Sequence, residues 1–168
     1  MEAGRGTRGA ANGGQLDGQI RTAGIIGSIE AVNLTQADPG HFEFAGAIYQ
    51  INDPNKADLV GTFFGDSSMT IIAGPTRGTS STSSIVDPNE IPGLAQYFVA
   101  GYHSHPANSL FFSGDSRAGT QDFAVPAAGY PLFMGTSTGG NSYRVRVALP
   151  TPTGTNFPDK VVFSGNYP

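Results

Sequence analysis

Apolar residues recur at helical spacing in the first part of the chain. Over residues 15–32, Leu16, Ile20, Ala23 and Ile26 recur three to four positions apart, which predicts a helix. Three glycines in this stretch each weaken a helix by about 1 kcal/mol relative to alanine. Residues 33–40 bring Asn, Asp, Pro and Gly together, which predicts a turn after the helix.

The later patterns are typical of β-strands. Residues 41–51 alternate and are rich in Phe, Ile and Tyr, and residues 94–105 have the composition of a buried strand. Further strands are predicted at 62–64, 68–73, 131–136, 143–149 and 160–164. A polar loop is predicted over 74–89, and a short helix over 117–124 after N-capping side chains at 113–116. Together they predict a single α+β domain over 15–168, a mixed sheet with an N-terminal helix and one short helix, behind a flexible tail at 1–14.

The composition narrows the classes of function. Charged residues make up 13% of the chain, the net charge is -4, and no Lys/Arg cluster is present, which argues against nucleic acid or anionic lipid as a partner. The absence of cysteine excludes thiolate metal ligands. No apolar run reaches the roughly 18 residues of a membrane span. The first residues lack the apolar stretch of a secretory signal.

One short motif carries metal-binding chemistry. His103 and His105 are two positions apart near the end of a predicted strand, so their side chains point to the same face. Pro106 ends the strand directly afterwards. Asp115 lies at the predicted start of the short helix, where it can return a carboxylate to the strand end. Two imidazoles and one carboxylate suit Zn²⁺ and leave a fourth position for water.

Two further carboxylates bear on this site. Among the four glutamates, Glu43 alone lies on a clear strand, between two phenylalanines. Apolar surroundings would raise the pKa of Glu43, as a general base near neutrality requires. Asp122 lies too far along the chain to match the expected ligand spacing. Asp115 has an alternative role as a helix cap, which is worth about 1 kcal/mol.

The motif resembles the signature of JAB/MPN (JAMM) metallopeptidases. The stretches FEFAGAIYQ, GYHSHP, FFSGD and GYPLFMGTSTG are most similar to JAB-like domains at the C-termini of Rhs and other polymorphic toxins, over about residues 28–147. The resemblance implies that His103, His105 and Asp115 bind zinc, that Glu43 is the general acid/base, and that Ser113 stabilises the oxyanion. The spacing departs from the family pattern. Nine residues separate His105 from Asp115 instead of ten, and one separates Ser113 from Asp115 instead of two.

Two functions of different kinds follow. The first is a zinc-dependent hydrolase of peptide or isopeptide bonds, secreted or delivered to a target cell as an effector. Its partners would be a protein or peptide substrate, a parent toxin chain and an immunity protein. The alternative is a non-enzymatic scaffold for binding or self-assembly in a larger particle, which the low charge and the long loop at 74–89 would suit.

Overall fold

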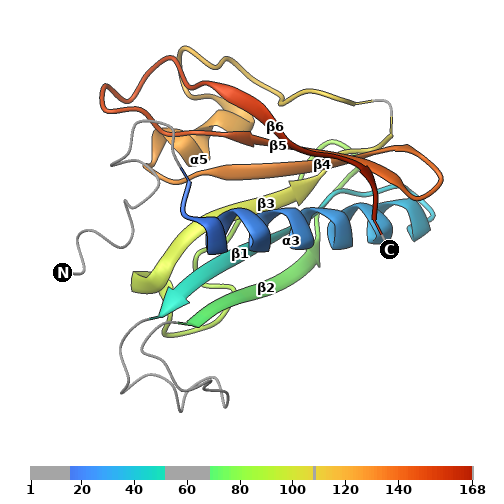
Figure 1. Ribbon diagram of the computed structural model, residues 1–168, viewed down its shortest axis with the longest axis horizontal. Helices are drawn as coiled ribbons and strands as arrows, with labels where there is room; N and C mark the ends of the chain where they lie inside the picture. The colour runs from blue at the N-terminus through green and yellow to red at the C-terminus, as the bar shows by residue number, and fades with distance from the viewer. Residues whose placement is uncertain (1–15, 52–68, 108, 168) are drawn as a thin grey trace.

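The computed structural model describes residues 16–51, 69–107 and 109–167, which form one long helix, one mixed sheet and short helical turns (Figure 1). The elements are α3 (Gly18–Ala37), β1 (Phe44–Ile51), β2 (Met69–Arg77), η2 (Ala95–Tyr97), β3 (Phe98–Ser104), η3 (Gln121–Phe123), α5 (Ala124–Ala127), β4 (Leu132–Gly139), β5 (Ser142–Ala148) and β6 (Asp159–Asn166). The strand predicted at 62–64 lies outside the described residues.

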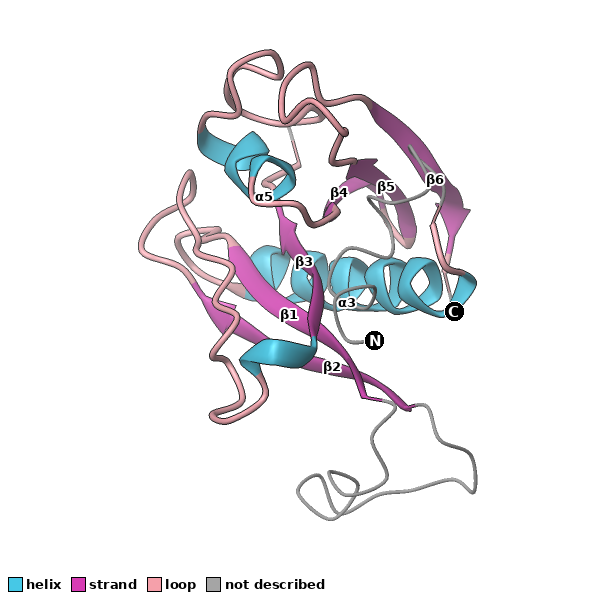
Figure 2. Cartoon of the chain, turned by 90° about the vertical axis from the view of Figure 1, so that its left-hand side faces the viewer, coloured by secondary structure: helices cyan, strands magenta, loops and turns pink. Residues whose placement is uncertain are grey.

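The six strands form a single sheet in the order β2-β1-β3-β4-β5-β6. Neighbouring strands are antiparallel except for β3 and β4, which are parallel. Helix α3 packs across one face, whereas α5 and the connection from β3 to β4 lie on the other side (Figure 2). The predicted α+β class, with a mixed sheet and an N-terminal and a short helix, is confirmed.

Helix α3 approaches the sheet closely because glycines face two aromatic rings. A Cβ atom on Gly24 would lie 2.4 Å from the ring of Phe133, and one on Gly27 would lie 3.0 Å from the ring of Tyr102. Both rings are fully buried. The glycines therefore weaken the helix locally but let it pack against the sheet, where most of the stability of a helix originates.

This packing makes Gly24→Ala destabilising despite the better helix propensity of alanine. The added methyl would push into the buried Phe133 ring, and overpacking of a core costs about 1–3 kcal/mol. Gly18→Ala in the same helix is the control, because nothing lies within 4 Å of a Cβ there. Urea denaturation should give a free energy of unfolding lower for Gly24→Ala than for Gly18→Ala. Equal values would show that the sheet does not restrict this position.

Two elements extend well beyond their predicted ends. Helix α3 continues to Ala37, beyond the expected end at residue 32, because Thr35 is buried and its hydroxyl bonds with that of Ser104. The helix stops at Asp38, whose backbone is extended before Pro39. Strand β2 runs to Arg77 instead of ending at residue 73, because a register shift opposite β1 accommodates residues 74–75 and pairing then resumes.

The short helix begins later than predicted. Residues 115–120 form turns in which the Asp115 carbonyl accepts backbone N–H groups, and helical structure begins at Gln121 and continues to Ala127. Pro126 does not end this helix, because proline is tolerated in a first helical turn, where its missing N–H needs no partner. The boundary matters for the site, since it moves Asp122 to the start of the helical segment.

Candidate metal centre

Strand β3 presents its histidines on the face away from α3. Tyr102 and Ser104 point to the helix, where Tyr102 packs against Gly27 and Ser104 bonds with Thr35. Because side chains alternate along a strand, His103 and His105 point to the opposite face. His105 follows the last residue of β3, yet its backbone N–H still donates to Gly135 in β4. The two imidazoles are thus held side by side, as the sequence predicted.

Both imidazoles direct the same nitrogen towards the backbone. His103 Nδ1 lies 3.1 Å from the carbonyl oxygen of Phe133, and His105 Nδ1 lies 3.2 Å from that of Ser109. Since a carbonyl only accepts hydrogen bonds, each Nδ1 carries the proton in the neutral ring. The unprotonated Nε2 atoms therefore face each other, 3.2 Å apart. Such a backbone bond on the far nitrogen is typical of metal-ligating histidines.

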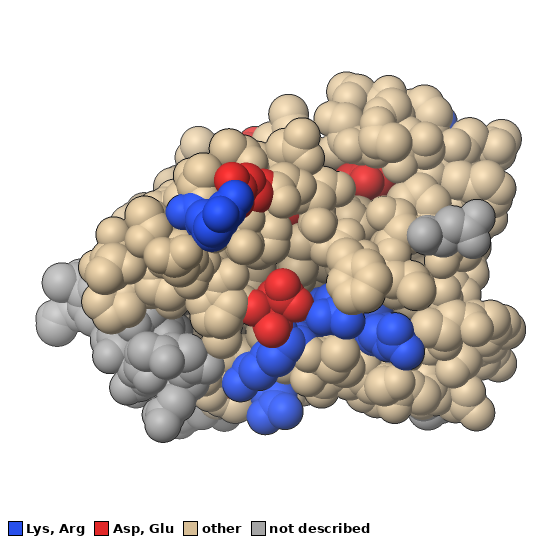
Figure 3. Space-filling model, turned by 90° about the horizontal axis from the view of Figure 1, so that it is seen from above, with Lys and Arg blue, Asp and Glu red and all other residues tan. Residues whose placement is uncertain are grey.

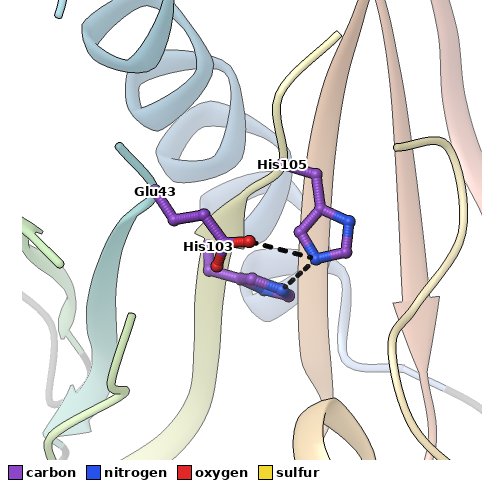
Figure 4. A group of neighbouring side chains, drawn as sticks. All are labelled: Glu43, His103 and His105. Carbon is purple, nitrogen blue, oxygen red and sulfur yellow. Dashed lines mark hydrogen bonds and ion pairs between the residues drawn. The ribbon is translucent and has the colours of Figure 1, made fainter. Parts of the chain in front are cut away.

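Glu43 reaches this pair from the position directly before the neighbouring strand, since β1 begins at Phe44 and not at residue 41 as predicted. Ala45 of β1 pairs with His103, and the antiparallel register continued by two residues sets Glu43 opposite His105. Its Oε2 lies 3.7 Å from His105 Nε2, and its Oε1 accepts a hydrogen bond from Ser84, 3.1 Å away. The three side chains converge in a buried cluster (Figure 4). One ligand atom from each lies within 4.8 Å of the others, so the cluster could hold a metal ion.

A second carboxylate, Asp122, contacts both histidines. Its Oδ1 lies 3.3 Å from His103 Nε2, and its Oδ2 lies 3.2 Å from His105 Nε2. The backbone N–H of Ser113 donates to Oδ2 at 2.7 Å, and the Asp122 N–H donates to the Ser113 carbonyl. These bonds orient the Asp122 side chain towards the imidazoles.

The structure places the predicted third ligand, Asp115, away from this cluster. The Asp115 side chain is 46% exposed, and its Oδ1 accepts the backbone N–H of Arg117 at 2.9 Å. It caps this turn and not a helix, which was its predicted alternative role, because helical structure begins only at Gln121. The carboxylate in contact with the histidines is Asp122, which the spacing had set aside, and the role of Asp115 as a ligand stays a prediction. Ser113 is exposed and reaches the site through its backbone; a role for its hydroxyl stays a prediction.

One signal in the sequence could have indicated Asp122. The stretch DFAVPAAG, residues 122–129, carries the helical segment and directly precedes β4, which runs parallel to the histidine strand. Counting back from β4, instead of forward from the histidines, places Asp122 at the helix start. The forward count fails because residues 109–120 form irregular turns whose path the spacing does not predict.

Asp122 and His103 shift each other's pKa in opposite directions. Burial opposes the charge on Asp122, but the imidazoles of His103 and His105 outweigh it and hold the pKa of Asp122 well below its usual range. Burial also opposes protonation of His103, yet the Asp122 carboxylate raises the pKa of that imidazole above its ordinary value. Positive charge is therefore favoured between these residues, and a bound cation can supply it in place of a proton.

Glu43 behaves differently from Asp122. Burial is the largest effect on Glu43 and raises the pKa of its carboxyl above the ordinary value, although the nearby His103 and His105 partly offset this. The direction is the one expected for a carboxylate between apolar neighbours. Two carboxyl groups at one site thus differ in proton affinity, an arrangement that separates a ligand from an acid/base group.

One face of the molecule is mostly uncharged. Seen from above, most of the surface is uncharged, and the visible Lys and Arg side chains gather mainly beside Asp or Glu (Figure 3). In the part of the chain that the structure describes, Arg77 pairs with Asp38, and Arg146 pairs with Asp159. No helix within these residues is long and apolar enough to cross a membrane.

The chain was compared with known proteins. No family model matches it, and the searches of curated proteins and solved structures likewise returned no match. Function must therefore be argued from the geometry of the site.

Proposed function

We propose that the protein is a zinc-dependent hydrolase of peptide or isopeptide bonds, with zinc bound by His103, His105 and Asp122. The main support for this proposal is the spacing of the nitrogen and oxygen atoms that would bind the metal. The two Nε2 atoms are 3.2 Å apart, and each lies beside a different oxygen of Asp122, with Oδ1 3.3 Å from His103 and Oδ2 3.2 Å from His105. A tetrahedral zinc with bonds of about 2.0–2.1 Å would separate its two nitrogen ligands by about 3.3 Å, which the imidazole pair matches, and the Asp122 carboxylate is within reach of both.

Asp122 suits the role of ligand better than Glu43 does. Asp122 contacts both imidazoles, whereas Glu43 contacts only His105 at 3.7 Å and has its other oxygen bound by Ser84. The lowered pKa of Asp122 keeps it ionised, as a ligand must be, whereas the raised pKa of Glu43 favours its uptake of a proton, as a general base requires. The three ligands leave one position for water or substrate.

This division of roles supports a hydrolytic reaction. When bound, zinc would polarise a substrate carbonyl and lower the pKa of water to about 7. Glu43 is placed to accept a proton from that water and to return it to the leaving nitrogen. The Nδ1–carbonyl bonds keep His103 and His105 in the tautomer that leaves Nε2 free.

The proposal is tested first by metal content and turnover. Protein purified without chelator should contain one zinc per chain by elemental analysis. It should also cleave members of a mixed peptide library, with chelation abolishing cleavage and added zinc restoring it. Protein that neither retains zinc nor takes it up would contradict the proposed site. Zinc at full stoichiometry without cleavage of any peptide or isopeptide would contradict the proposed reaction.

Zinc should also stabilise the fold measurably. An ion that binds only the folded state adds about 2.7 kcal/mol when its free concentration is 100 times the Kd. Thermal unfolding of chelator-treated protein should therefore shift to higher temperature as zinc is added. Magnesium is the control, because it prefers six oxygen ligands and does not suit two imidazoles. Equal shifts with both ions would contradict a zinc-selective site.

Membership of the JAB/MPN (JAMM) metallopeptidases, and delivery as an effector with an immunity partner, stay predictions from the resemblance. The site geometry adds support to the first of these. It brings two histidines, an aspartate and a separate glutamate together, although the aspartate is a different residue from the one that the resemblance implied.

A further inference from the structure

A pocket of about 230 Å³ adjoins the proposed metal ligands. His103 and Asp122 form part of its lining. Apolar wall comes from residues 85–86, from residues 124–125 and from Leu132. None of its lining residues is Lys or Arg. The pocket therefore combines a polar end, where the chemistry would take place, with an apolar wall.

The wall at residues 84–86 is held against the site on both sides of Ile85. Ser84 donates its hydroxyl to Glu43. Val86 packs on Gly101 of β3, where a Cβ atom would lie 2.5 Å from a Val86 methyl. Ile85, between these anchors, is 73% exposed. An apolar side chain fixed in water at the rim of a polar site gains stability when a ligand covers it.

Size and charge limit what the pocket can accept. Sites for drug-sized ligands span about 300–1,000 Å³, so this smaller pocket suits a single side chain. The lining holds no Lys or Arg that would pair with an acidic side chain. The apolar wall also cannot replace the hydration of a charged group. An aliphatic side chain meets none of these penalties.

Ile85 also borders a second hollow, which indicates a longer ligand. Ser84 and Ile85 line a further pocket of about 340 Å³, whose other lining residues are mostly polar and include Arg77, Asp87 and Glu90. A chain that places one side chain beside the metal centre can thus continue past Ile85 into polar surroundings. This favours a peptide segment over a free small molecule.

We infer that the pocket beside His103 and Asp122 binds the aliphatic side chain of the residue that carries the scissile carbonyl, and that Ile85 determines this specificity. The inference rests on the proposed zinc peptidase function. It names the substrate class as peptides with leucine-like residues at the cleavage point, and it gives Ile85 a contact role without any part in metal binding.

Binding of hydroxamates to the zinc-loaded protein tests this without requiring turnover. A hydroxamate group would anchor each probe at the metal, and calorimetry would compare N-acetyl-leucine hydroxamate with its near-isosteric aspartate analogue. The leucine probe should bind at least about tenfold more tightly, as expected for an aliphatic group in an apolar pocket. Acetohydroxamate, without a side chain, reports the metal alone.

Two variants test whether Ile85 determines the preference for the leucine probe. Ile85→Asn should reduce the leucine preference about tenfold and leave acetohydroxamate affinity and zinc content unchanged. The change is at an exposed position, where substitutions cost little stability, and circular dichroism checks that the fold is kept. Val161→Asn, at a 44% exposed valine on β6, is the matched control and should keep the preference.

The outcomes separate the two proposals. If acetohydroxamate binds but leucine and aspartate probes bind equally, or a lysine analogue binds more tightly than leucine, the specificity inference is overturned and the metal centre stands. An unchanged preference in Ile85→Asn overturns the role of Ile85. If zinc and all hydroxamates fail to bind, the proposed function is overturned together with the inference. A leucine preference without peptide cleavage supports the inference and contradicts the proposed turnover.

Discussion

Glu43→Gln is expected to abolish hydrolysis while the protein keeps its zinc. Glutamine retains the size and hydrogen-bonding oxygen of Glu43, including an acceptor for Ser84, but cannot take up a proton. Loss of general acid/base catalysis lowers rates by about 10²–10⁴-fold. Elemental analysis of the same preparation should still give one zinc per chain, because His103, His105 and Asp122 supply the proposed ligands.

The control for this variant is Glu30→Gln, a change of the same type at an exposed residue of helix α3, outside the cluster of Glu43, His103 and His105. It should keep both zinc and activity. If Glu43→Gln loses zinc as well as activity, Glu43 is itself a ligand, as its place in the buried cluster would allow. If it remains fully active, Glu43 is not the general base.

Asp122→Asn should remove zinc from the site. The neutral amide would lose the charge that balances the cation and would leave two imidazoles as ligands. Replacing an outer partner of a metal ligand typically weakens binding about 10–100-fold, and loss of a ligand should exceed this. Competition with a chelator of known zinc affinity would measure the change, and peptide cleavage should fall with zinc occupancy.

Asp115→Asn is the matched control, because both aspartates lie in the connection between β3 and β4. Asn can retain the turn by accepting the Arg117 N–H, so zinc affinity should stay within about twofold of the wild type. The opposite result, with zinc lost in Asp115→Asn and kept in Asp122→Asn, would restore the ligand set implied by the resemblance and contradict the one proposed from the structure.

The sequence predicted most of the fold because helices and strands each require a characteristic local spacing of apolar residues. The apolar spacing indicated helix α3, and alternation or apolar runs indicated all of the strands β1 to β6. Boundaries were less well predicted where tertiary contacts decide them. The bond of Thr35 to Ser104 and the pairing of β2 beyond residue 74 both depend on segments distant in sequence.

In the site, too, local periodicity predicted some features, whereas contacts between distant segments decided the others. The convergence of His103 and His105 could be predicted, since residues two apart on a strand share a face. The placing of Glu43 opposite His105 requires the register between β1 and β3. Ser84 and Ile85 reach the site through a loop that packs on Gly101. None of these long-range pairings is encoded in the spacing of neighbouring residues.

The sequence by itself determined that two imidazoles lie together at the end of a buried strand. Only the tertiary structure decided which carboxylate joins them. Asp115 is closer in sequence, but its side chain closes a turn, and the irregular path of residues 109–120 brings Asp122 to the imidazoles instead. The physical reason is that a strand propagates side-chain direction over two residues, whereas a loop of this length is positioned only by what it packs against.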